Sequence, residues 1–256
     1  MKYSPSDNLI LYVDEDILVI NKPAGLPSLP DGYDPEADHV RTLLEPEYGP
    51  LWMVHRLDRQ TSGVLLLARS EAAHRDLNAQ FESRETAKVY HTLIAGNPNW
   101  EERQVSLALR PNADRKHRTT VDARYGQPAL TNFRVVERFG IVTLLEAAPE
   151  TGRTHQIRVH LKAIGFSILG DQLYGDGQPL YLSAIKPRYQ PGRKAGRERV
   201  EQEFRRPETP ILDRLALHAL SVSLRHPGTQ EPLTVEAPYP KDIALSLKQL
   251  RKYRAK

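Results

Sequence analysis

The sequence predicts an α+β protein built on a largely antiparallel, mixed β-sheet with flanking helices and loops. Short apolar segments rich in β-branched and aromatic residues recur along the chain and are joined by tight polar turns. Between them lie a few stretches whose apolar residues follow helical spacing. Strands joined by hairpins with helices between them are typical of this class, and the chain contains no internal repeat.

The first strands form a predicted hairpin over residues 9–13 and 17–21, separated by the acidic turn at 14–16. Residues 27–50 are rich in proline, glycine and acids, which favours a loop with a short helix around 40–44. The continuous apolar run at 63–68 predicts a buried strand.

A helix is predicted over residues 70–84, because Ser70 is a suitable N-cap and Ala73, Leu77 and Phe81 recur every four residues. A strand over 89–95 follows and ends at a glycine.

The second half predicts a hairpin of strands 130–138 and 141–147, then a helix over 154–164 that Gly165 ends. Late strands at 217–224 and 233–237 precede a basic helix over 242–252.

Residues 186–209 lack apolar periodicity and are strongly basic, so we expect an insertion, partly helical near 197–204. Strand-like sequence resumes directly after it. We therefore expect a single domain over residues 1–256 with a core at about 10–240.

The composition limits the function. The chain has 256 residues and no cysteine, which excludes disulfides, thiolate metal sites and cysteine nucleophiles and fits a reducing cytoplasm. The apolar runs are too short to span a membrane, and the N-terminus lacks the apolar core of a signal peptide. A net charge of +4 favours an anionic partner.

The segment HRLDRQTSG places Asp58 between Arg56 and Arg59, just before the buried strand. An unpaired carboxylate at the edge of a core would be costly, and a nearby arginine would keep it ionised. The structural alternative is an aspartate that caps the turn through the amides of Thr61 or Ser62, and the sequence favours neither.

The segment GRTHQIRVH lies on the predicted helix 154–164, where His155 and Arg158 are three residues apart. Arg158 follows the apolar Ile157 and can reach inward from the helix flank, although a solvated arginine is the alternative. His155 and His160 are five residues apart and share no helical face, so they make a poor metal pair.

In the segment KVYH, strand alternation places Lys88 and Tyr90 on one face. Tyr90 could serve as an acid, a base or a stacking platform, or be an ordinary strand tyrosine. The sequence contains no phosphate-binding glycine loop, zincin motif or nucleophilic-serine elbow. We therefore expect neither a cofactor nor a metal.

Three blocks, in this order and spacing, resemble the RluA family of RNA pseudouridine synthases: HRLDRQTSG, KVYHTLIAG and GRTHQIRVHLKAIGFSILGDQLYG. The opening YVDEDILVINKPAGLPS and the late RLALHALSVSLRHP support the resemblance, which covers residues from about 10 to 240. The resemblance implies the pseudouridine synthase catalytic fold and an isomerase that converts uridine to pseudouridine within RNA.

The resemblance also implies residue roles. Asp58 matches the family's essential aspartate, as nucleophile or as acid–base group, and Arg158 matches the arginine that pairs with it. Tyr90 matches a tyrosine that stacks on the uracil ring and serves proton transfer. Such a reaction is redox-neutral and needs no metal or cofactor.

Substrate binding is implied for three further residues. Arg56 matches an arginine that enters the RNA stack in place of the flipped uridine, and Arg153 and His155 are further RNA-binding candidates. The resemblance implies a ribosomal or transfer RNA substrate.

Basic residues are concentrated at 110–118, at 186–206 and in the tail from 248, where we expect phosphate contacts. Some relatives carry a small RNA-binding domain before the catalytic one. Here strand-like catalytic sequence starts near residue 9, so we expect no such domain, and we expect a monomer.

Two alternatives to this function remain at this stage. One is a non-catalytic RNA-binding or RNA-folding protein on the same fold. The other is a hydrolase of glycosidic bonds, which usually needs two carboxylates and a water. No clear second carboxylate is found, because residues 14–16 lie in a hairpin turn and Asp171 follows an apolar stretch.

Overall fold

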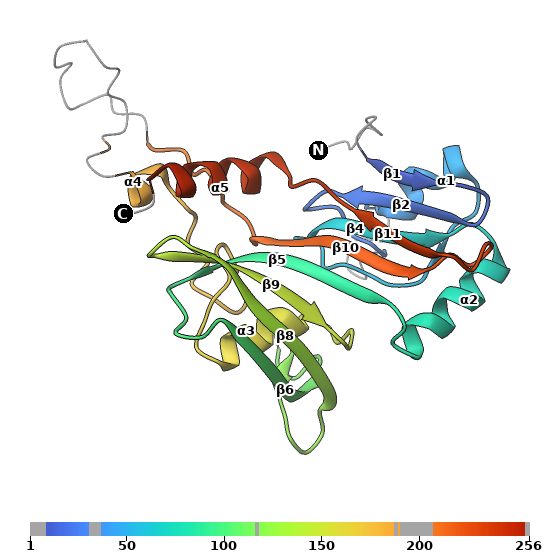
Figure 1. Ribbon diagram of the computed structural model, residues 1–256, viewed down its shortest axis with the longest axis horizontal. Helices are drawn as coiled ribbons and strands as arrows, with labels where there is room; N and C mark the ends of the chain where they lie inside the picture. The colour runs from blue at the N-terminus through green and yellow to red at the C-terminus, as the bar shows by residue number, and fades with distance from the viewer. Residues whose placement is uncertain (1–8, 31–36, 116–117, 187–188, 190–206, 254–256) are drawn as a thin grey trace, which may run out of the picture.

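The computed structural model describes residues 9–30, 37–115, 118–186, 189 and 207–253. In this part of the chain an 11-stranded mixed sheet forms the body of the molecule (Figure 1). The strands are β1 (Ile10–Val13), β2 (Ile17–Lys22), β3 (Trp52–Met53), β4 (Ser62–Ala68), β5 (Ala87–Ala95), β6 (Glu102–Arg110), β7 (Thr120–Val121), β8 (Gln127–Arg138), β9 (Val142–Pro149), β10 (Leu217–Arg225) and β11 (Pro232–Glu236). The helices are α1 (Val40–Tyr48), α2 (Glu71–Glu82), α3 (Gln156–Ala163), α4 (Leu182–Ile185) and α5 (Lys241–Tyr253).

The strand order is β1-β2-β4-β10-β5-β9-β8-β6-β7, with β11 beside β10 and β3 beside β4. Among these pairs β4–β10 is parallel and the others are antiparallel. The predicted α+β class with a mixed, largely antiparallel sheet is confirmed. Both predicted hairpins form, β1 with β2 and β8 with β9.

Helix α2 begins as predicted, because the Ser70 hydroxyl accepts a hydrogen bond of 3.1 Å from the amide of Ala73. Its buried face packs on β2, β4 and the β10–β11 pair. Strand β4 is buried along its whole length, which explains why its sequence is continuously apolar rather than alternating.

Several boundaries and elements differ from the prediction. Helix α1 extends beyond residue 44 to Tyr48, through Pro46, and ends at Gly49, whose amide donates to the carbonyl of Glu45. Strands β6 and β7 were not predicted, because Val105 and Leu109 alternate with polar residues too weakly to mark a strand. Helix α3 begins at Gln156 rather than at 154.

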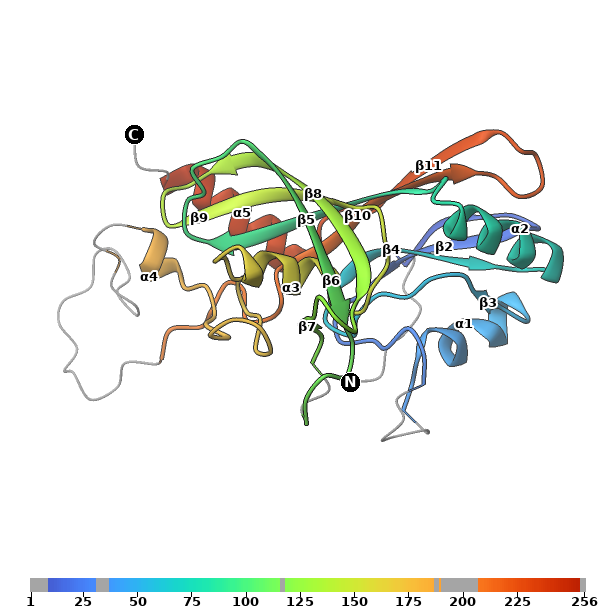
Figure 2. The same cartoon turned by 90° about the horizontal axis from the view of Figure 1, so that it is seen from below.

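The sheet has a narrow junction between β4 and β10, which pair over two positions, His218 with Ser62 and Ala219 with Gly63. Gly63 has a φ of +111°, and a Cβ there would lie 2.1 Å from the carbonyl oxygen of Ala219. Only glycine therefore allows this approach. On either side lie the β1-β2-β4 half with α1 and α2, and the β5-β9-β8-β6 half with α3 (Figure 2).

The basic insertion predicted at 186–209 falls mostly outside the described residues, which here include Lys186, Tyr189 and the segment from 207. None of the helices in the described ranges has the length and apolar character needed to cross a membrane.

Candidate active site

A cleft of about 570 Å³ opens beside the β4–β10 junction, between the two halves of the sheet. It is lined by the segment before β4, the end of α2, the start of β5 and the segment leading into α3. All six residues that the sequence singled out line it: Arg56, Asp58, Tyr90, Arg153, His155 and Arg158. Segments about 100 residues apart in the chain thus supply one site.

The backbone before Asp58 is fixed by Ser28. The hydroxyl of Ser28 donates to the carbonyl of Leu57 at 2.9 Å and accepts from its amide at 3.1 Å. After Asp58, the turn closes through its backbone carbonyl, which accepts from the amide of Thr61 at 3.0 Å. The alternative of an aspartate side chain that caps the turn therefore does not describe this segment.

Lys22 supports the same loop from inside. Its side chain is fully buried, and its ammonium donates to three carbonyl oxygens, those of Leu26, Pro23 and Arg59, at 2.8–3.2 Å. Burial lowers the pKa of Lys22 to about 7, and the charge of Asp58 opposes this shift. The ammonium joins the loop after β2 to the loop that carries Asp58.

Asp58 and Arg158 meet in the cleft. Arg158 Nη1 donates to Asp58 Oδ2 at 3.2 Å, and the side chains are 7% and 20% exposed respectively. A partly buried, charge-assisted contact of this kind orients the carboxylate. The alternative of a solvated arginine is wrong, because helix α3 turns Arg158 inward.

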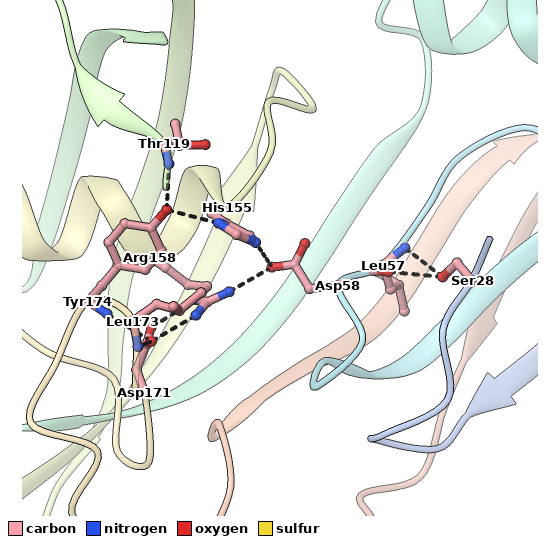
Figure 3. Close-up of polar contacts among 9 residues, drawn as sticks. All are labelled: Ser28, Leu57, Asp58, Thr119, His155, Arg158, Asp171, Leu173 and Tyr174. Carbon is pink, nitrogen blue, oxygen red and sulfur yellow. Dashed lines mark hydrogen bonds and ion pairs between the residues drawn. The ribbon is translucent and has the colours of Figure 1, made fainter. Parts of the chain in front are cut away.

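Arg158 is held by a second carboxylate, Asp171 (Figure 3). Its Nε and Nη2 each donate to one oxygen of Asp171 at 2.8 Å, a bidentate pair. The amides of Leu173 and Tyr174 also donate to Asp171 Oδ1, at 3.0 and 3.1 Å. Asp171 is only 1% exposed, and burial alone would raise its pKa. The hydrogen bonds and the charge of Arg158 outweigh this effect and hold the pKa of Asp171 below its usual value.

His155 approaches the same oxygen of Asp58 as Arg158, with Nε2 3.7 Å from Asp58 Oδ2 (Figure 3). Tyr174 holds the other nitrogen of the ring. The Tyr174 hydroxyl accepts from the amide of Thr119 at 2.8 Å and lies 2.8 Å from His155 Nδ1, within hydrogen-bond distance. Burial lowers the pKa of His155, which favours the neutral imidazole.

The backbone of His155 has a φ of +57°, uncommon for a residue with a side chain. This left-handed conformation interrupts the helix, which explains why α3 begins at Gln156, two residues later than predicted. Gln156 fixes the segment, because its side-chain oxygen accepts from the hydroxyl of Thr151 at 2.7 Å and the amide of Arg153 at 3.0 Å.

Tyr90 lies on β5, the strand between β10 and β9. Burial and the neighbouring charge of Asp58 raise the pKa of Tyr90 far above neutrality. Its hydroxyl is therefore protonated at neutral pH and can donate a hydrogen bond to a group in the cleft.

The two remaining candidates lie nearer solvent. Arg56 is exposed on the segment before Asp58, and Arg153 is half-buried with Nε directed to the carbonyl of Pro128 at 3.3 Å. Both line the cleft, but among the described residues neither forms a hydrogen bond or an ion pair with Asp58.

Sequence reasoning missed Asp171, Tyr174 and Ser28. Asp171 follows an apolar stretch, and burial of that stretch places its carboxylate against Arg158 of α3. The signal was the GDQLYG segment, which contains both Asp171 and Tyr174 at the end of the third family block.

Asp14, Asp16 and His226 form a separate group with metal-ligand geometry. Here His226 Nδ1 accepts from the amides of Gly228 and Thr229, so Nε2 carries the proton that it donates to Asp14 at 2.7 Å. The group joins the β1–β2 turn to the β10–β11 turn and lies outside the cleft.

Comparison with known proteins gives a consistent assignment. The sequence profile of the RNA pseudouridylate synthase family matches residues 16–163. The chain is 34% identical over 230 residues to the dual-specificity RNA pseudouridine synthase RluA of Pasteurella multocida, covering 90% of this chain and 92% of that one. It is 36% identical over 253 residues to the ribosomal large subunit pseudouridine synthase C of Escherichia coli strain K12, covering 96% and 71%. Among solved structures, human RNA pseudouridylate synthase domain containing 4 is similar, with a TM-score of 0.68, 28% identity and coverage of 94% and 92%.

Proposed function

The chain belongs to the RluA family of RNA pseudouridine synthases, isomerases that convert uridine to pseudouridine in RNA, and we propose that Asp58 is its essential catalytic residue. The observation that carries this proposal is the position of the Asp58 carboxylate, 3.2 Å from a buried arginine and open to the cleft. A carboxylate oriented in this way by a charge-assisted hydrogen bond is suited to react with substrate rather than to support the fold.

The reaction sets what the site must do. The bond from ribose C1′ to uracil N1 breaks, the base turns, and C5 is joined to C1′. A proton leaves C5 and one is gained at N1, so the product is an isomer of the substrate. Asp58 acts on the sugar or on the base, as nucleophile or as acid–base group. Arg158 keeps it in place, because its other nitrogens are bound to Asp171.

Tyr90 is proposed to lie against the uracil ring. Its hydroxyl is protonated at neutral pH because burial and the charge of Asp58 raise its pKa. It can therefore donate a hydrogen bond to the base. A proton transfer through Tyr90 would contribute roughly 10²–10⁴ in rate, as is usual for general acid–base catalysis.

The base must leave its stack to reach Asp58, because the cleft lies between the two halves of the sheet. Unstacking costs roughly a few kcal/mol. We propose that Arg56, exposed beside the cleft, fills the vacated position with its planar guanidinium.

The RNA substrate is proposed to be ribosomal or transfer RNA, modified in the cytoplasm. The name of the Escherichia coli relative refers to the ribosomal large subunit, and that of the Pasteurella relative to dual specificity. Basic residues at 110–118 are candidates for phosphate contacts, although Arg110 and Arg118 already pair with Asp122 and Asp114 at 3.4 and 2.6 Å.

The geometry disfavours a glycosidic hydrolase. Such an enzyme needs a second carboxylate that can activate water. Asp171 is the nearest candidate in the third family block, but it is 1% exposed and both of its oxygens are bound to Arg158.

The test is a reaction of purified wild type and Asp58→Asn with ribosomal and transfer RNA from cells that lack the protein. Pseudouridine is detected by carbodiimide adducts, free uracil by chromatography, and RNA binding by filter retention. We expect pseudouridine from the wild type alone, no free uracil, and similar binding by both proteins. Free uracil would indicate a hydrolase, and binding without product from either protein would indicate a non-catalytic RNA-binding protein.

A further inference from the structure

Lys88 lies in the cleft without a role in the chemistry described above. It is on β5, two residues before Tyr90, and both side chains line the cleft. Residues two apart on a strand point to the same face and lie roughly 6.5–7 Å apart. Lys88 therefore lies next to Tyr90 on the same strand face. It is at the end of the cleft where Asn78 and Phe81 of α2 form the wall.

The Lys88 ammonium has no anionic partner in the described part of the chain. It forms no ion pair or hydrogen bond with a described residue, and it lies over the ring of Phe81, 5.7 Å from the centroid. Burial lowers the pKa of Lys88. A partly desolvated cation with an aromatic ring as its neighbour is costly unless an anion completes the site.

Its other neighbour does not supply that anion. His55 stacks on Phe81 at 5.1 Å, and its Nε2 accepts from the amide of Leu66 at 3.0 Å. Burial and the charge of Lys88 lower the pKa of His55 to about 3, so the ring is neutral. The Glu82 carboxylate lines the same end of the cleft but is exposed, and it forms no ion pair with Lys88.

Lys22 is a buried lysine with a structural role, and its contacts provide a comparison for Lys88. Its ammonium is enclosed by three carbonyl oxygens at 2.8–3.2 Å. Lys88 lacks such a cage and faces the cleft instead. The difference between the two lysines indicates that the partner of Lys88 comes from outside the described part of the chain.

We propose that Lys88 binds a phosphate of the target nucleotide while Tyr90 lies against its base. This inference rests on the proposed function, because it takes the occupant of the cleft to be a uridine in RNA. A nucleotide carries a base and an adjacent phosphate on one sugar, and Tyr90 and Lys88 offer a base contact and an anion contact two residues apart on one strand face. Lys88 thus helps to fix the uridine relative to Asp58.

The first experiment measures binding without catalysis. Uridine, uridine 5′-monophosphate and uridine 3′-monophosphate are titrated into the full chain and followed by NMR chemical shifts at pH 7.5. The variants are Lys88→Met, which removes the charge at similar length, and Lys88→Arg, which retains it. Lys241→Met is the control, since Lys241 is an exposed lysine at the start of α5.

We expect the wild type to bind at least one monophosphate about ten- to hundredfold more tightly than uridine. Lys88→Met should lose that preference, while Lys88→Arg and Lys241→Met should keep most of it. The proposal is overturned if Lys88→Met binds the monophosphates as the wild type does, or if the wild type does not distinguish them from uridine.

Kinetics on a modified RNA separate this proposal from the proposed function. Lys88→Met should raise KM by about tenfold or more and change kcat much less, because a phosphate contact binds substrate and transition state alike. A large loss of kcat with an unchanged KM would contradict phosphate binding although the enzyme remains a pseudouridine synthase. Failure of the wild type to form pseudouridine would instead contradict the proposed function. The mononucleotide titration would still show whether Lys88 binds a phosphate.

Discussion

Asp171 holds the guanidinium of Arg158 through two hydrogen bonds of 2.8 Å, although Arg158 lies in α3 and Asp171 in the loop that follows it. Arg158 is thereby left with one nitrogen, Nη1, directed to Asp58 at 3.2 Å. The three side chains form a line from the core to the cleft. The orientation of the proposed catalytic carboxylate thus depends on a residue that does not touch the cleft.

Asp171→Asn should lower catalysis without removing RNA binding. The substitution replaces one carboxylate oxygen by an amide NH₂, which cannot accept from Arg158, so the guanidinium loses its bidentate anchor. A misplacement of about 1 Å at a reacting group can cost roughly 10²-fold, and we expect a loss of that order in kcat. Single-turnover kinetics on a substrate RNA measure it.

The matched control is Asp176→Asn, which changes an exposed aspartate five residues along the same loop. It should retain wild-type kcat. Equal kcat for Asp171→Asn and the wild type would show that the bidentate pair does not position Asp58.

Arg56→Ala tests base flipping. If Arg56 fills the position that the uridine leaves, its removal should harm the modification of a stacked uridine more than that of an unstructured one. We expect kcat/KM to fall at least tenfold on a structured RNA and clearly less on an unstructured oligonucleotide of the same sequence. Equal losses on the two substrates would show that Arg56 serves general RNA binding.

The buried His218 predicts a pH dependence of stability. Its side chain is inaccessible, its Nε2 donates to the carbonyl of Ala237 at 3.2 Å, and burial lowers its pKa from 6.5 to about 4. Between these two values the unfolded chain binds a proton that the folded chain does not, so stability falls as the pH falls through that window.

Urea unfolding of the wild type and His218→Gln at pH 7.5 and pH 5.0 tests this prediction. The wild type should lose about 2 kcal/mol more than the variant between the two pH values. The variant should be the less stable protein at pH 7.5, because it disturbs a buried contact with Ser62. The same pH-dependent loss in both proteins would exclude His218 as its source.

Gly63→Ala should destabilise the protein by disturbing the junction of the two halves. A Cβ at Gly63 would lie 2.1 Å from the carbonyl oxygen of Ala219, and the φ there is +111°. Gly140→Ala is the matched control, since its φ is also positive, at +86°, but nothing lies within 4 Å of the added Cβ.

Thermal unfolding separates the steric contribution from backbone strain. Gly140→Ala should cost about 1–3 kcal/mol from backbone strain alone. Gly63→Ala should cost clearly more, and its activity should fall because the Asp58 loop leads directly into this junction. Equal costs for the two variants would show that β4 and β10 can separate without penalty.

The strands and helices with clear periodicity could be predicted from the sequence, because their patterns depend on local burial. Helix α2 and the β8–β9 hairpin follow their expected ranges closely. Strands β6 and β7 could not, because they are held by pairing with β8 and with each other rather than by a strong pattern of their own. The start of α3 also escaped prediction, because the left-handed His155 depends on contacts with Tyr174 and the loop before it.

The six candidate residues could be placed in one site because three long motifs resemble one family. The six candidates do not include Asp171, Tyr174 or Lys88. Asp171 and Tyr174 act through Arg158 and His155, and such indirect roles become visible only when the loop after α3 is seen packed beneath it. The sequence places Lys88 on the same strand face as Tyr90, but only the folded chain shows that no described residue supplies an anionic partner for it.

The most direct test is a transcriptome-wide pseudouridine map in cells that lack this protein, complemented with wild type or with Asp58→Asn. Carbodiimide adducts and reverse-transcription stops locate each site. We predict that specific uridines in ribosomal or transfer RNA lose their modification in the deletion strain and regain it with the wild type alone. Restoration by Asp58→Asn would contradict the central role of Asp58, and an unchanged map in the deletion strain would contradict the proposed function.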